Sequence, residues 1–324
     1  MKPGYKRFQR YLTEIRPLLE KVARQKNPAL WLYKNNLRTP LFMLEGLAKM
    51  HISFHNPNKF TRIKMQVKLL EDTLGAIDYY DNFAKELQQN KKIPKSIIAY
   101  LQAQTREKIQ SLNEQLLEKG WLNFEHGRIQ KIEKKLSKAD WLDSAKEIKS
   151  IHAFYTHAIG EIITFADRSD FHFKNVESEV HELRRKLRWL SIYPQALGGA
   201  IQLKDNKKTP PHLKKYLTPL VKQSPFNQLP PVGDNKHTLE LEKNYFYSLS
   251  WMIDALGKLK DNGLRVIIVK EALQQTSSVS DTEAYKKTYA LLGKKQLTIR
   301  EVLDEADKLV KTYIREKNLN RLLA

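Results

Sequence analysis

Helical periodicity is the feature of this sequence that most restricts its fold. Along nearly every long segment, apolar residues recur at steps of three and four, which places them on one side of an α-helix. In the segment from Val180 to Tyr193, Val180, Leu183, Leu187 and Leu190 form one such apolar stripe. No segment shows the sustained two-residue alternation that is typical of a half-buried strand. The sequence therefore predicts an all-α protein without a β-sheet.

Prolines and polar turns predict where the helices end. We expect helices over residues 5–24, 31–50, 60–88, 96–119, 129–136, 141–166, 180–193, 238–274, 282–292 and 297–323, with a turn over 121–127. The region from residue 204 to 235 is rich in proline, and only a short helix near residues 212–222 is expected there. Pro40 either kinks its helix or starts a new one with Thr39 as the N-cap, and Asp140 is the expected cap of a later helix.

Charge is the most informative feature of the composition. The 324 residues include 57 Lys and Arg but only 36 Asp and Glu, so the net charge is +21. Such an excess favours a polyanionic partner. The absence of cysteine excludes disulfides and cysteine-ligated zinc. The basic amino terminus lacks the apolar core of a signal peptide, and no run of about 18 apolar residues occurs, so we expect a cytoplasmic protein that does not span a membrane.

A short motif occurs in both halves of the chain. D-x-L-G is found at Asp72–Gly75 and again at Asp254–Gly257, late in a long helix each time. Each copy follows an earlier helix that carries an L-R pair, Leu37-Arg38 in the first half and Leu183-Arg184 in the second. A glycine inside a helix costs roughly 1 kcal/mol relative to alanine, so two in matching places indicate close helix packing. The repeat predicts two related helical bundles.

These motifs also resemble those of a known family. H-E-L-R-x-x-L-R at His181–Arg188, L-G-K-L-K-D at Leu256–Asp261 and L-G-A-I-D-Y-Y-D at Leu74–Asp81 are similar to signatures of the CHAD family, the conserved-histidine α-helical domains. The resemblance implies two pseudo-symmetric antiparallel four-helix bundles, here residues 1–166 and 167–324. It also implies a basic surface that binds inorganic polyphosphate, and a protein associated with polyphosphate granules in the cytoplasm.

The helix that begins at Val180 supplies the centre of the expected site. His181, Arg184 and Arg188 lie along one flank of the apolar stripe, at about 100° per residue. Like charges four residues apart repel each other, and a bound anion would offset this repulsion between Arg184 and Arg188. We expect Glu177 and Glu182 to pair on the far side, with Lys186 and Arg185, and to point away from the His181 flank.

A larger set of basic residues is expected to contact the polyanion. The predicted polyphosphate-binding set is His181, Arg184, Arg185, Arg188, Lys34, Arg38, Lys49, Lys64, Lys68, Lys258 and Lys260. Lys34, Arg38 and Lys49 are assigned to the first signature helix, and Lys64 and Lys68 to its partner. If the two halves are related by pseudo-two-fold symmetry, these rows meet on one surface. Replacing Arg184 and Arg188 with alanine should then weaken binding and change thermal stability little.

The first repeat departs from the family pattern. Asn35 stands at the position of the family's histidine, and Phe42, Met43 and Glu45 replace further arginines. Whether this repeat binds the ligand is therefore open. Two other partners also fit the charge: a nucleic acid, although nothing resembles a helix-turn-helix, and an acidic protein for which this chain is a scaffold.

No catalytic constellation is found in the sequence. HExxH, GxGxxG, GxxxxGK[ST] and GxSxG motifs are absent, and histidines such as His51 and His55 are scattered. The paired carboxylates Glu71 and Asp72 are assigned to outward helix positions. Asn35–Leu41 resembles the phosphoacceptor box of sensor histidine kinases, but asparagine offers no nucleophilic imidazole. We therefore expect a binding protein with no enzymatic activity, cofactor or metal.

Overall fold

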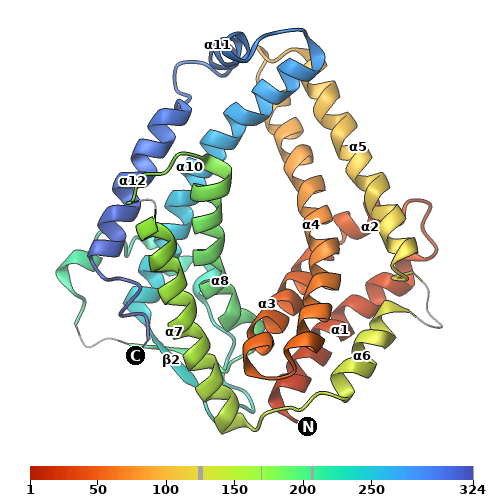
Figure 1. Ribbon diagram of the computed structural model, residues 1–324, viewed down its shortest axis with the longest axis vertical. Helices are drawn as coiled ribbons and strands as arrows, with labels where there is room; N and C mark the ends of the chain where they lie inside the picture. The colour runs from red at the N-terminus through yellow and green to blue at the C-terminus, as the bar shows by residue number, and fades with distance from the viewer. Residues whose placement is uncertain (123–126, 169, 206–207, 324) are drawn as a thin grey trace. The chain divides into compact units, whose positions relative to one another are not determined.

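The structure is a computed structural model that describes residues 1–122, 127–168, 170–205 and 208–323 (Figure 1). Helices account for most of these residues, so the all-α prediction is confirmed. The chain divides into two compact units, residues 1–147 and 148–324. The sequence-based boundary between residues 166 and 167, which separates the two repeats, stays a prediction. Most of the turn predicted over residues 121–127 lies outside the described residues.

The first unit consists of packed helices. Its elements are α1 (Pro3–Val22), α2 (Pro28–Lys34), α3 (Arg38–Phe54), α4 (Pro57–Gln88), α5 (Lys95–Glu118), α6 (Arg128–Ser137) and the first residues of α7 (Ser144–Arg168). The long helix α4 packs along α3 on one side and α5 on the other, while α1 contacts α3 and α6. Fully buried leucines, isoleucines and phenylalanines fill the spaces between these helices, as the helical period requires.

The second unit is arranged around α10. After α7 come the π-helical turn η1 (Val176–His181), α8 (Glu182–Ala196), β1 (Ile201–Lys204), η2 (Pro211–Leu213), α9 (Pro219–Gln223), η3 (Pro225–Asn227), β2 (Leu239–Glu242), α10 (Lys243–Thr276), α11 (Asp281–Leu292) and α12 (Ile299–Arg315). Helix α10 contacts α8, η1, α11 and α12. No helix in the described ranges is both long enough and apolar enough to cross a membrane.

The prediction that the chain has no β-sheet was wrong in one place. Strands β1 and β2 pair in parallel, with Ile201 opposite Leu239 and Lys204 opposite Glu242. Leu239 and Leu241 are buried on one face of β2 while Glu240 is exposed. Four residues are too few for their alternation to be distinguished from a helical pattern, and the partner strand lies more than 30 residues away.

Three predictions of local structure also need correction. Helix α3 begins at Arg38 with Leu37 as its N-cap, so Thr39 is not the cap. Pro40 is the third residue of the helix, where a backbone N–H would have no intrahelical acceptor, so the proline removes no hydrogen bond. Helix α7 begins only at Ser144, and Asp143 accepts from the Lys146 N–H at 2.9 Å, a capping role that was expected of Asp140. The single helix expected near residues 212–222 is a 3₁₀ turn followed by the short helix α9.

Candidate anion-binding site

The helix that carries the His181 flank is held by its apolar stripe. The stripe residues are at most 1% exposed, as predicted: Val180, Leu183, Leu187 and Leu190. His181 ends the π-helical turn η1 and is the N-cap of α8. Because the stripe faces the core of the second unit, the flank is directed outward from it, with Arg184 half-buried and Arg188 exposed.

Arg184 is held against helix α10 by its own side chain. Its Nε donates a hydrogen bond to the Ile253 carbonyl at 3.1 Å. A Cβ atom built on Gly257 would lie 3.0 Å from that Nε, so the glycine leaves room for the guanidinium. Burial lowers the pKa of Arg184, while Asp261 and Asp254 oppose this shift. Arg184 forms no ion pair with any residue in the described part of the chain.

Arg38 occupies the matching place in the first unit. A Cβ atom on Gly75 would lie 2.7 Å from its Nη2, so each D-x-L-G glycine lies against the L-R arginine of its own unit. Unlike Arg184, Arg38 is paired with carboxylates. Its Nε donates to Glu71 Oε1 at 2.8 Å, and its Nη1 donates to Asp78 Oδ2 at 3.2 Å. The pseudo-symmetric arrangement of whole bundles stays a prediction.

Two positions in the repeat account for this difference, because Ile253 stands where the first unit has Glu71, and Lys260 stands where it has Asp78. Glu71 and Ile253 each stand immediately before the D-x-L-G motif. In the first unit the carboxylate of Glu71 receives the arginine Nε, whereas in the second unit the main-chain carbonyl of Ile253 receives it. Glu71 is only 5% exposed, so its assignment to an outward position was wrong. The arginine of the first unit therefore contacts carboxylates directly, whereas in the described part of the chain Arg184 has Asp254 and Asp261 nearby but no carboxylate in ion-pair contact.

The carboxylates near the flank only partly follow the prediction. Glu182 pairs with Arg185 at 2.6 Å and with Lys186 at 3.8 Å, as expected. Glu177 does not point away from the flank, because its Oε1 lies 3.1 Å from His181 Nδ1. Residues four apart lie on the same side of a helix, and this hydrogen bond lowers the pKa of Glu177.

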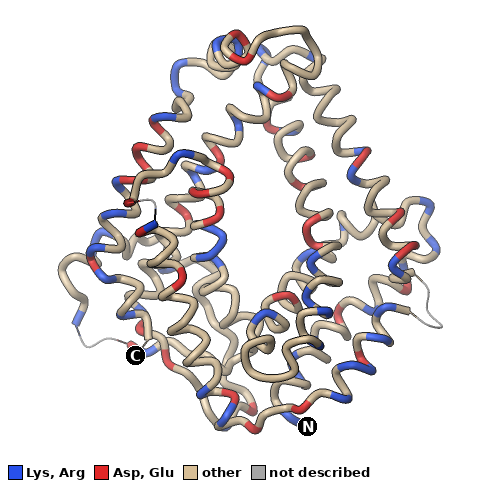
Figure 2. The backbone as a smooth tube through the Cα atoms, viewed as in Figure 1, with Lys and Arg blue, Asp and Glu red and all other residues tan. Residues whose placement is uncertain are grey.

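Basic residues are spread over the helices of both units (Figure 2), and the predicted lysines lie on α2, α3, α4 and α10. Lys34 is the last residue of α2 and not part of α3, to which it was assigned. In the second unit, Lys258 pairs with Asp254 at 2.8 Å, and Lys260 pairs with Asp261 at 2.6 Å. Lys68 pairs with Asp72 at 2.5 Å in the first unit. The Lys258 pair is well exposed and contributes little stability, so this ammonium group can turn to an external anion at small cost, whereas the Lys260 side chain is only 17% exposed.

Glu45 adds a second buried carboxylate to the first unit. It is 5% exposed, and burial raises its pKa to about 6. Lys68 and Lys49 oppose this shift, while the negative charge of Glu71 adds to it. Negative charge between α3 and α4 weakens the attraction of this region for a polyanion. Lys64 lies on the same helix as Lys68, at an intermediate exposure.

His51 and His55 are not scattered, as the sequence suggested, but in contact. His51 Nδ1 lies 3.2 Å from His55 Nε2, and the salt bridge of Arg7 to Glu147, at 2.8 Å, is buried beside them. Burial lowers the pKa of His51 and raises that of Glu147. Phe8, Phe60 and Trp141 surround the His51 ring. The cluster is therefore part of the core of the first unit.

Within the described ranges, no group of three or more potential ligands lies close enough together to hold a metal ion. The chain matches no model of a known protein family, and no curated protein is significantly similar to it. The resemblance to the CHAD family therefore stays a prediction that rests on the motifs of the two repeats.

Proposed function

We propose that this protein binds inorganic polyphosphate, without hydrolysing or transferring it, through a surface of the second unit centred on Arg184. The observation that carries the proposal is that this side chain is partly buried and held in place without an ion-pair contact. Arg184 is half-buried, fixed by the Ile253 carbonyl and Gly257, and without an ion pair in the described part of the chain. Asp254 and Asp261 are near enough to act on its charge but do not contact it, so an anion that reaches this partly desolvated guanidinium is expected to stabilise it.

The surroundings of Arg184 favour a long anion over a single phosphate. His181 and Arg188 lie on the same flank, and Lys258 and Lys260 follow the glycine that Arg184 contacts. Polyphosphate carries roughly one charge per phosphate on a flexible chain, so that it gains affinity from many contacts and from counterion release. A net charge of +21 supports the same class of ligand.

Binding by the first unit is proposed to be weaker. Arg38 already contacts the carboxylates of Glu71 and Asp78, and an external phosphate would have to displace them. Lys34, Lys49, Lys64 and Lys68 then act as additional cations that a long chain reaches. A cytoplasmic location at polyphosphate granules belongs to the same proposal.

The test is a competition experiment on the purified protein. Long-chain polyphosphate, duplex DNA and RNA compete for a labelled polyphosphate probe over a series of salt concentrations. We expect polyphosphate to compete best, and Arg184→Ala with Arg188→Ala to weaken its binding roughly ten- to a thousandfold at low salt. Lys286→Ala with Lys294→Ala removes the same charge from exposed positions and is the control.

Two results contradict the proposal. In the first, duplex DNA or RNA displaces the probe better than polyphosphate does, which favours nucleic-acid binding. In the second, the arginine variant folds normally and binds as tightly as the control variant. Because Arg184 is half-buried, its replacement also costs some stability, in contrast to the expectation from sequence. Arg184→Lys, which retains the charge, provides a second variant if the alanine variant is poorly folded.

A further inference from the structure

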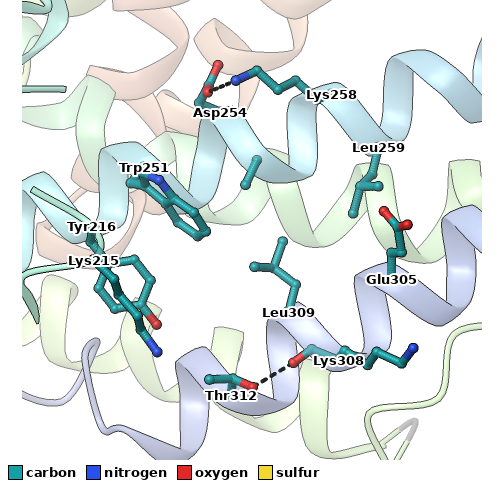
Figure 3. Close-up of a pocket in the computed structure, with 11 residues that line it drawn as sticks. Lys215, Tyr216, Trp251, Asp254, Lys258, Leu259, Glu305, Lys308, Leu309 and Thr312 are labelled. Carbon is teal, nitrogen blue, oxygen red and sulfur yellow. Dashed lines mark hydrogen bonds and ion pairs between the residues drawn. The ribbon is translucent and has the colours of Figure 1, made fainter. Parts of the chain in front are cut away.

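A cleft of about 630 Å³ lies between α10 and α12 of the second unit (Figure 3). Its volume is in the range of small-molecule sites. Trp251, Leu259 and Leu309 form apolar walls, and Lys258, Lys308 and Glu305 bring charged groups to it. The cleft lies outside the Arg184 contact, because Ile253 and Gly257 face α8 while these α10 residues lie on another side of the helix.

Trp251 offers an aromatic surface in this cleft. Its ring packs edge-on against Tyr216, with centroids 4.9 Å apart and an interplanar angle of 64°. Figure 3 shows the indole and Leu309 facing each other from the two helices. The indole is only partly buried, and its N–H forms no hydrogen bond with another described residue. A flat ring inserted beside Trp251 would therefore stack on the part of the indole that Tyr216 and Leu309 leave exposed.

The charged groups at the cleft have both signs. Lys308 and Glu305 lie one turn apart on α12, both exposed, and neither side chain has a partner among the described residues. Lys258 pairs with Asp254 at 2.8 Å, but both side chains are well exposed. A ligand that complements this cleft has anionic groups for the lysines and hydrogen-bond donors for the carboxylate of Glu305.

We propose that the cleft binds a nucleoside polyphosphate. The base lies against Trp251 and Leu309, the hydroxyl or amino donors reach Glu305, and the phosphates contact Lys258 and Lys308. Base stacking on an aromatic side chain supplies affinity that a bare phosphate chain lacks. This site goes beyond the polyphosphate surface, with which it shares only Lys258, and it does not depend on Arg184.

The test compares three probes by calorimetry on the full chain in magnesium-free buffer. The probes are ATP, adenosine and inorganic tripolyphosphate, which separate the base from the phosphates. We expect ATP to bind about tenfold more tightly than tripolyphosphate, and adenosine to bind more weakly than ATP. Trp251→Leu should weaken the binding of ATP about tenfold and leave the binding of tripolyphosphate unchanged. Lys308→Gln should weaken the binding of both phosphate probes about threefold. Lys311→Gln, which changes another exposed lysine of the same helix that does not line the cleft, should weaken the binding of neither.

Equal affinity of the protein for ATP and tripolyphosphate overturns the proposal. So does a Lys308→Gln variant that binds ATP as tightly as the Lys311→Gln variant does. Because Lys308 is exposed, that comparison holds even if Trp251→Leu fails to fold. The Arg184→Ala and Arg188→Ala variant separates the two sites. This variant should lose its binding of long-chain polyphosphate but retain its binding of ATP. Failure of one proposal is therefore distinguishable from failure of the other.

Discussion

The two L-R arginines are expected to differ in what they contribute to stability. Arg38→Ala removes contacts of 2.8 and 3.2 Å to two carboxylates, and it leaves Glu71, 5% exposed, without its guanidinium. Removing one partner of a fully buried pair costs about 3–5 kcal/mol. Because the Arg38 side chain is 40% exposed, water replaces part of the lost interaction, and we expect a loss of about 2–3 kcal/mol.

Arg184→Ala is expected to cost less. It removes one hydrogen bond, the 3.1 Å contact to the Ile253 carbonyl. A hydrogen bond to a charged group contributes about 1.5–3 kcal/mol, but a helical carbonyl still has its own intrahelical N–H after the side chain is removed. Burial already lowers the pKa of Arg184, so the substitution also removes a desolvated charge. We expect a net loss of about 1 kcal/mol.

Urea unfolding followed by circular dichroism measures the two losses, and polyphosphate titration at low salt measures the two affinities. The order should be reversed between the assays: Arg38→Ala is the more destabilising variant, and Arg184→Ala is the weaker binder, by about tenfold or more. Equal destabilisation would refute the assigned internal ion pairs. A larger loss of binding in Arg38→Ala would refute the assignment of the anion surface to the second unit.

Three further predictions concern other features of the chain. Gly160→Ala in α7, where an added Cβ has open space, should stabilise the protein by about 0.5–1 kcal/mol, whereas Gly257→Ala should lose this gain because it displaces Arg184, as urea unfolding will show. The folded-state pKa of His51 is lowered, so the stability that its neutral form contributes is lost as pH falls below about 6.5. Glu45 and Glu147 have raised pKa values, so their contribution to stability changes in the opposite direction as pH falls. His51→Leu should therefore reduce the fall in Tm between pH 7 and pH 5. Incubation with polyphosphate or ATP should release no phosphate in a colorimetric assay, and release that a single substitution abolishes would contradict the absence of catalysis.

Much of the local structure follows from the sequence alone. Apolar residues at helical spacing predict helices wherever the segment is long, because the period of 3.6 residues is a property of neighbours in the chain. The stripe of Val180 and Leu183 is buried as this period requires. The D-x-L-G repeat and the L-R pairs also pointed to the two glycines that lie against arginines. A glycine inside a helix is less favourable than alanine, so its presence indicates close packing at that position.

The partners of Arg38 and Arg184 were decided only by the tertiary structure, in contrast to local pairs such as that of Glu182 with Arg185. Arg38 meets Glu71 and Arg184 meets Ile253 across 33 and 69 residues of chain, and no local pattern records such a pairing. The same holds for β1 and β2, which are too short to show a period and are stable only as a pair. The sequence by itself determined the helices and the charge. Whether a given arginine has a carboxylate beside it, and so whether it is available to an external anion, depends on which helices pack together.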